Sequence, residues 1–161
     1  MQPPGCIMST VATDRIEKEI VIKAPRSRVW RAIAQPLEFG AWFQVDMSGV
    51  EFRAGHPVRG KMTYPGYEGM PFEMVIDRIE PERLFSFRWH PYAIDPNVDY
   101  SNEPMTLIEF RLEDVAEGTR LRITESGFDA IPLPRRAEAF RMNAGGWDEQ
   151  LHNIEAYVAR G

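Results

Sequence analysis

The sequence predicts an α+β fold, in which a curved antiparallel sheet of about six to seven strands wraps on a long C-terminal helix. Three observations predict it. Residues 15–23 alternate between apolar and polar side chains and precede two short helical segments. Between residues 50 and 125, short alternating segments are joined by tight turns, and strands joined so tightly pair antiparallel. From residue 132 onward, apolar residues recur at intervals of three and four, as on one helix face.

Prolines bound the two short helices. Pro25 suits the first turn of a helix, and Pro36 ends the apolar run that follows it. Residues 36–43 form the second helix, with Gly40 as a flexible point inside it. The predicted order of elements is therefore a strand, two short helices, a run of strands and a long helix.

The alternating part of the chain predicts six further strands. Gly, Pro and Glu mark the short turns between them, and residues 90–104 form one long polar loop. An antiparallel sheet has one face to bury, and only the C-terminal helix is large enough to cover it. The space between sheet and helix is the natural place for a cavity. The predicted strands are residues 50–52, 56–64, 71–79, 83–89, 105–113 and 119–125.

The long helix carries a single apolar stripe. A stripe of about three heptads also suits a coiled-coil seam, but an uncovered sheet earlier in the chain favours packing within the molecule. Two adjacent glycines, Gly145 and Gly146, interrupt the helix, although each Gly costs roughly 1 kcal/mol relative to Ala. The stripe consists of Ala137, Phe140, Ala144, Trp147, Leu151, Ile154 and Val158.

The composition is that of a soluble globular protein. The chain has 161 residues, of which 43% are hydrophobic and 27% charged. The net charge of −5 argues against binding to nucleic acid or anionic membranes, because phosphate groups need a basic surface. No apolar run approaches the ~18 residues of a membrane span, and the first residues do not resemble a secretory signal. The only cysteine, Cys6, excludes an internal disulfide, so we expect a cytoplasmic location without membrane insertion.

Four stretches carry a resemblance to a known family. They are IVIKAPRSRVWRAIAQPLEFGAWF (20–43), IEPERLFSFRW (79–89), GTRLRITESGF (118–128) and GGWDEQLHNIEAYV (145–158). They resemble the activator of Hsp90 ATPase homologue 1-like family, within the START and Bet v 1-like superfamily that also holds polyketide cyclases. The resemblance implies one helix-grip domain over residues 15–160. Residues 1–14 are polar, contain Pro and Gly, and are expected to be a disordered tail.

The resemblance suggests a role for the two glycines. Members of the family begin or bend the long helix near a Gly-Trp pair. A surface without side chains would let the helix backbone approach the sheet, and a break would let residues 135–143 pivot over the cavity. The alternative is that the glycines only separate a short helix from the long one, and the sequence leaves both interpretations open.

No motif for metal, nucleotide or nucleophilic chemistry occurs. The histidines His56, His90 and His152 lie on different elements without metal-binding spacing. Cys6 has no designated base, and the ESGF stretch lacks the first glycine of a nucleophile elbow. No glycine-rich phosphate loop is present. We therefore expect neither a metal nor a cofactor.

Glu125 is the carboxylate best placed for a role in the cavity. It shares strand parity with Leu121 and Ile123, so we expect it to point inward. A carboxyl group in an apolar pocket has a raised pKa and could act as an acid or base, with Tyr64 and His90 as the other catalytic candidates. A structural role is favoured, in which Glu125 accepts backbone N–H groups or pairs with an arginine.

The inward-facing aromatic residues carry the main functional prediction. Each one alone is best explained as ordinary core, but together they suit a pocket for an apolar or aromatic ligand. The segment around Trp42, the turn at 64–68 and the loop at 90–104 would form its mouth. The predicted ligand-binding residues are Trp42, Met62, Tyr64, Phe72, Met74, Phe87, Trp89, Phe110, Phe140 and Trp147.

Three functions compete, and binding of a small hydrophobic ligand is favoured. A cyclase- or dehydratase-like enzyme using the same cavity is implied by some helix-grip relatives and needs a polar group inside it. An Hsp90-interaction module is implied by the family's name, but that co-chaperone works alongside a separate N-terminal domain for which this chain has no room. We therefore do not expect Hsp90 binding. Homodimerisation through a sheet edge or the outer face of the long helix stays open.

Overall fold

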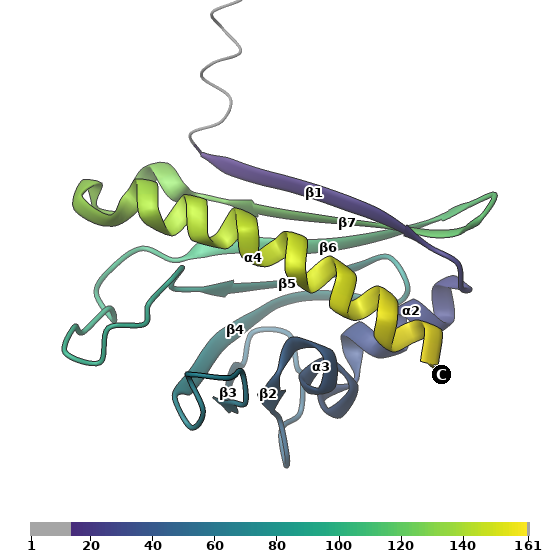
Figure 1. Ribbon diagram of the computed structural model, residues 1–161, viewed down its shortest axis with the longest axis horizontal. Coiled ribbons are helices and arrows are strands. Elements are labelled where there is room, and N and C mark those ends of the chain that lie inside the picture. The colour runs from purple at the N-terminus through teal and green to yellow at the C-terminus, as the bar shows by residue number, and fades with distance from the viewer. Residues whose placement is uncertain (1–13, 161) are drawn as a thin grey trace, which may run out of the picture.

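The computed structural model describes residues 14–160, which form a seven-stranded sheet, three α-helices and one short 3₁₀ helix (Figure 1). Most of the predicted disordered tail, with Cys6, lies outside the described residues. The elements in chain order are β1 (Arg15–Ile22), α2 (Arg26–Ala34), α3 (Pro36–Phe43), β2 (Val45–Asp46), β3 (Pro57–Met62), β4 (Pro71–Glu80), β5 (Leu84–Trp89), β6 (Thr106–Val115), β7 (Gly118–Ser126), η1 (Phe128–Ala130) and α4 (Leu133–Arg160).

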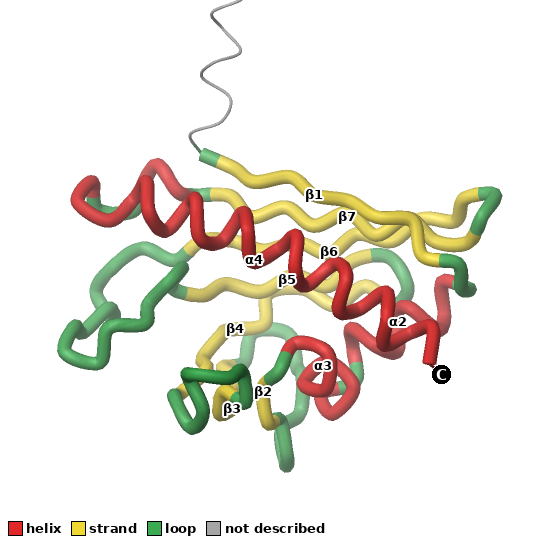
Figure 2. The backbone as a smooth tube through the Cα atoms, in the orientation of Figure 1, coloured by secondary structure: helices red, strands yellow, loops and turns green. Residues whose placement is uncertain are grey.

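The sheet has the strand order β1-β7-β6-β5-β4-β3-β2, and each strand runs antiparallel to its neighbours. From β2 to β7 the chain is a meander, whereas β1 returns to the far edge beside β7. α4 crosses one face of this sheet, and α2 and α3 lie near its C-terminal end (Figures 1 and 2). The predicted helix-grip architecture, with two short helices after the first strand, is confirmed.

A bulge in β4 contributes to the curvature of the sheet. The register with β5 shifts between Ile76 and Arg78, opposite Ser86. The Ser86 hydroxyl is buried, accepts the backbone N–H of Arg78 at 3.1 Å and donates to Asp77 at 2.9 Å. Because an extra residue bends a strand and increases its twist, this polar pair fixes a bend in the middle of the sheet.

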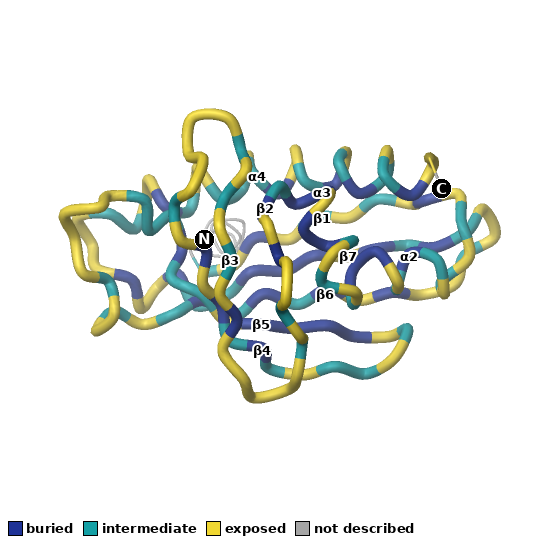
Figure 3. Tube along the Cα trace, turned by 90° about the horizontal axis from the view of Figure 1, so that it is seen from below, coloured by how far each residue is buried: buried dark blue, intermediate teal, exposed yellow. Residues whose placement is uncertain are grey.

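The core lies between the sheet and the three helices. Buried positions follow the inward faces of the central strands and the underside of α4, while the hairpin tips are exposed (Figure 3). The apolar stripe on α4 is buried at Trp147, Leu151, Ile154 and Val158 as predicted. Ala137 was wrongly assigned to it, because Ala137 is exposed and Ala139 is buried instead.

Two further sequence predictions are corrected. Residues 50–52 form no strand, and the short edge strand is Val45–Asp46, which pairs with Met62 and Lys61. α4 is also continuous through Gly145 and Gly146, so the glycines neither begin nor break it. A Cβ atom added at either glycine would meet nothing within 4 Å, which excludes a close approach to the sheet.

Candidate functional site

The space between sheet and helices is occupied by a continuous set of aromatic rings. Each ring has its centroid 4.8 to 6.5 Å from that of at least one other member. We call this set the aromatic cluster. Its members are Trp30, Phe39, Trp42, Phe43, Phe52, Phe72, Phe85, Phe87, Trp89, Phe110 and Trp147.

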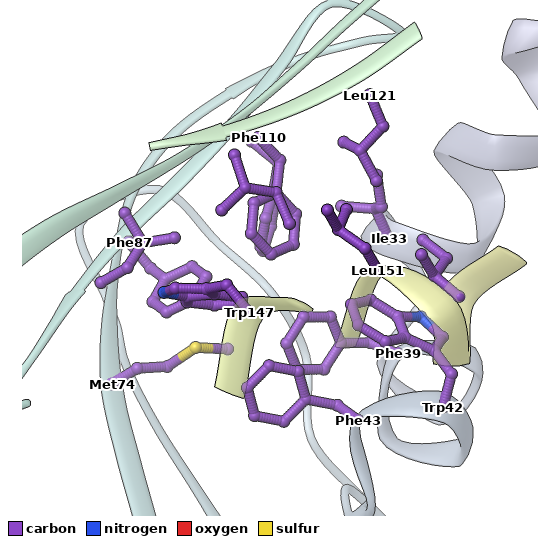
Figure 4. Packing of buried hydrophobic residues seen from close by; sticks show 14 of the residues in the cluster. Ile33, Phe39, Trp42, Phe43, Met74, Phe87, Phe110, Leu121, Trp147 and Leu151 are labelled. Carbon is purple, nitrogen blue, oxygen red and sulfur yellow. The ribbon is translucent and has the colours of Figure 1, made fainter. Parts of the chain in front are cut away.

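The cluster is densely packed. Phe39 and Phe43 of α3 stack at 4.8 Å, and Phe43 meets Trp147 of α4 at 6.0 Å. Figure 4 shows Trp147 between the sheet residues Phe87 and Phe110 and the rings of α3. In this arrangement the side chains of three layers interdigitate, so the rings themselves fill the predicted cavity.

Most of the predicted ligand-binding residues belong to this packed interior. Six of them are members of the aromatic cluster, and Met74 is buried beside it. Met62 is half-buried at the cluster's edge. Tyr64 and Phe140 lie apart from it, because Tyr64 packs on Tyr67 and Phe140 packs on Phe128. The Trp42 indole N–H donates to the carbonyl of Ala32 at 2.8 Å and is not free for a ligand.

Glu125 is the polar centre of this interior. It lies near the end of β7, opposite Ile108 of β6 and Ile16 of β1, and its side chain is fully buried. Each carboxylate oxygen accepts one indole N–H, from Trp147 at Oε1 and from Trp89 at Oε2, both at 2.8 Å. The predicted inward orientation is therefore observed.

Two smaller side chains complete the shell around Glu125. The Thr106 hydroxyl lies 2.6 Å from Oε2, and the Asn143 amide nitrogen lies 3.0 and 3.1 Å from Oε1 and Oε2. Neither residue is among the predicted site residues. A signal for each existed, since Thr106 shares strand parity with Phe110 and Asn143 precedes Trp147 by one helical turn.

The Glu125 carboxylate has no positively charged partner within residues 14–160. All its hydrogen bonds come from two indoles, an amide and a hydroxyl. The expected backbone N–H groups or arginine are replaced by these neutral side chains. Burial raises the pKa of the Glu125 carboxyl above its ordinary value, while the hydrogen bonds from its four partners act in the opposite direction.

The other two catalytic candidates lie elsewhere. The Tyr64 hydroxyl donates to Glu149 of α4 at 3.4 Å, and the charge of Glu149 raises the pKa of Tyr64. The His90 Nε2 lies 3.1 Å from the backbone carbonyl of Glu103. Among the described residues neither side chain makes a hydrogen bond to Glu125, so the three candidates do not form one constellation.

The loop at 90–104 is fastened to the first turns of α4 by one arginine. Arg135 donates to Glu103 Oε1 at 2.7 and 2.9 Å and to the carbonyl of Pro91 at 2.8 Å. Its guanidinium also lies 4.7 Å from the ring centre of Tyr100. The loop and the N-terminal part of α4 are therefore joined as one unit at the same end of the sheet as Trp89, Thr106 and Glu125.

Two hollows on the outside of the molecule are lined by other residues. One of about 360 Å³ lies beside α2, α3 and the end of α4, where Glu38 already accepts from Arg28, Arg31 and Tyr157. The other, of about 160 Å³, involves residues of β6 and β7. Within residues 14–160, no three His, Cys, Asp or Glu side chains gather as metal ligands, and no helix is long and apolar enough to span a membrane.

Comparison with known proteins assigns the family. The model of the family described as Activator of Hsp90 ATPase homolog 1-like protein matches residues 23–159. The chain belongs to this family. The match confirms the resemblance seen in the sequence and spans both short helices, the sheet from β2 to β7 and nearly all of α4. No functionally curated protein matches the sequence.

Solved structures share the fold at low sequence identity. Protein MLL2253 from Mesorhizobium loti is 24% identical, with a TM-score of 0.69, and the match covers 91% of this chain and 97% of that one. A protein from Arthrobacter aurescens is 17% identical, with a TM-score of 0.73 and coverage of 94% and 89%. Protein NE0264 from Nitrosomonas europaea is 17% identical, with a TM-score of 0.70 and coverage of 92% and 96%. These similarities concern the fold alone.

Proposed function

We propose that the protein binds a small hydrophobic or aromatic ligand between the sheet and α4, beside Glu125. One observation carries this proposal: within residues 14–160, a fully buried carboxylate is held only by neutral donors at the edge of an aromatic cluster. A buried charge without a counter-charge is unfavourable for stability, and apolar residues of similar volume usually stabilise a core better. Perturbed, buried ionisable groups of this kind concentrate at functional sites.

The half-buried members of the predicted ligand set mark where a ligand would enter. Trp89 and Met62 are half-buried at the ends of β5 and β3, and Phe140 is half-buried on the first part of α4. The sheet register places these strand ends at the same end of the sheet as Glu125. Members of the family commonly bind hydrophobic ligands, which supports a ligand of this class.

Entry of a ligand needs a movement, because the rings fill the interior. The first part of α4 is the element best suited to move, since Gly145 and Gly146 weaken the helix and a Cβ atom at either position would stand in open space. Asn143 lies before the glycines and Trp147 after them, so a bend at the glycines would withdraw Asn143 from Glu125 and leave Trp147 in place. Arg135 would carry the loop at 90–104 along with the helix.

The four tryptophans offer a direct test. In a ¹H–¹⁵N spectrum, titration with the neutral probe propylbenzene should shift the indole signals of Trp89 and Trp147, which bond to Glu125. The signals of Trp30 and Trp42 are the internal controls, since the Trp42 N–H is bonded to Ala32. Saturable shifts at the first pair, larger than those at the second, support the proposal. Equal shifts at all four, or none at any, would contradict it.

A further inference from the structure

We infer that the ligand is a small arylalkylamine, whose ammonium group binds the Glu125 carboxylate. The inference rests on the proposed function and names the class of ligand for that site. In the shell around Glu125, four side chains make five contacts to the two carboxylate oxygens. The indoles and the amide nitrogen can only donate, and the Thr106 hydroxyl donates as well. With donors alone around it, the carboxyl is held in its ionised form, a negative charge without a cation within residues 14–160.

A cation is the complement of this site. Among the described residues the only charge at its centre is negative, and a charge-assisted hydrogen bond from an ammonium group is stronger than one from a neutral amide. A ligand carboxylate would instead face a like charge in a buried place. The site thus selects against fatty acids and other anions, although its walls are apolar.

The surrounding rings favour the same ligand. Trp89 and Trp147 stack with centroids 5.6 Å apart, and Phe43 lies 6.1 and 6.0 Å from them. Both indoles direct their N–H edges at Glu125, so these rings contribute packing against the aromatic ring of a ligand. A carboxylate beside three such rings suits a molecule that combines an aromatic ring with an amine.

Asn143 is the partner that the ammonium group would replace. It is the only donor to Glu125 from the part of α4 before the glycines, and it is half-buried. Its amide nitrogen bonds to both carboxylate oxygens, which is the position an ammonium group would take between them. The remaining donors, Thr106, Trp89 and Trp147, would stay in place and hold the carboxylate for the ligand.

Three probes with the same phenylethyl group and different end groups test the charge directly. We would titrate the protein at neutral pH with 2-phenylethylamine, propylbenzene and 3-phenylpropionate, following the indole signals of Trp89 and Trp147. The amine should bind at least about tenfold more tightly than the hydrocarbon, and the carboxylate should bind most weakly. Equal affinity of amine and hydrocarbon would overturn the inference. The proposed function would stand in that case, because propylbenzene still binds; if no probe shifts any indole signal, both fail.

Two variants assign the preference to Glu125. In Glu125→Gln the amine and the hydrocarbon should bind with affinities within about twofold of each other, because the charge is gone. The matched control Glu109→Gln changes a glutamate of β6 that bonds to Arg111 and Thr124, and it should keep the wild-type preference. Retention of the amine preference in Glu125→Gln would overturn the inference.

A third variant decides the question if Glu125→Gln does not fold. Asn143→Ala removes the donor that competes with the ammonium group but keeps the carboxylate. The ratio of amine to hydrocarbon affinity should rise by about threefold or more, since the amine no longer displaces a hydrogen bond. A ratio that is unchanged or falls would show that the amine does not take the place of Asn143.

Discussion

The two parts of α4 on either side of the glycines are held in different ways. The part after them, residues 147–160, buries Trp147, Leu151, Ile154 and Val158 against the sheet and the short helices. The part before them, residues 133–144, fully buries only Ala139. Apolar packing therefore fixes the C-terminal part, whereas the N-terminal part is held mainly by polar contacts.

The two parts of α4 also differ in the segments to which their polar side chains bond. The N-terminal part is fastened by Arg135 to the loop at 90–104 and by Asn143 to Glu125. The C-terminal part is fastened to regular elements, with Gln150 bonded to the carbonyl of Phe43 and Tyr157 bonded to Glu38. One half of a single helix can thus serve as a fixed wall of the site while the other serves as its cover.

The largest expected difference between the halves is in stability after truncation. Trp147→Ala should lower the free energy of unfolding by about 3–5 kcal/mol, because it removes a buried ring and a donor to Glu125. Phe140→Ala should cost about 1–2 kcal/mol, since Phe140 is only half-buried. Urea denaturation gives both values. Equal losses would remove the distinction between the two parts.

The Arg135 contact is the next test. Arg135→Met should lower stability by about 1–2 kcal/mol and increase hydrogen exchange in residues 90–104, because the loop loses its bonds to α4. Lys18→Met is the matched control, as it breaks the more exposed Lys18–Asp148 pair of the C-terminal part. That change should stay within about 0.5 kcal/mol. Unchanged exchange in the loop of Arg135→Met would show that other contacts hold it.

Substitution of the two glycines should raise stability, whereas the changes above lower it. The double variant Gly145→Ala and Gly146→Ala should stabilise the protein by about 1–2 kcal/mol, because both Cβ atoms would stand in open space. It should also slow the binding of propylbenzene in stopped-flow fluorescence if bending at this point admits the ligand. Ala156→Gly, at an exposed position of the C-terminal part, is the control and should not alter the binding rate. A double variant that binds as fast as wild type would contradict the role of the glycines.

The smallest expected effect is the pH dependence of stability that Glu125 causes. Glu125 accepts hydrogen bonds from both parts of α4, through Asn143 and Trp147. Burial raises its folded-state pKa above the ordinary value of 4.5, so between the two values the folded protein binds more protons than the unfolded chain. The group's contribution to stability is therefore most favourable below pH 4.5 and declines as pH rises through the folded pKa. Urea denaturation at several pH values should show wild-type stability falling relative to Glu125→Gln as pH increases. A rise over the same range would show that the hydrogen bonds outweigh burial.

The elements of the fold other than the two-residue edge strand Val45–Asp46 were predictable, because each depends on a local pattern. Strand alternation gave the inward orientation of Glu125 and Trp89, and helical spacing gave the buried face of α4 after Trp147. The partners of Glu125 were not predictable in the same way, since they come from three elements separated by up to 36 residues in sequence from it. The glycines were misinterpreted because a helix packed on a core can include residues of low propensity without breaking.

Hydrogen exchange along α4 distinguishes a cover from a fixed wall. In the free protein, amide exchange should be faster in residues 133–144 than in residues 147–160, and the faster segment should slow when 2-phenylethylamine is added. The loop at 90–104 should follow the N-terminal part, because Arg135 joins them. Uniform slow exchange along the whole helix, unaffected by the probe, would contradict the claim that one part covers a binding site and the other forms its wall.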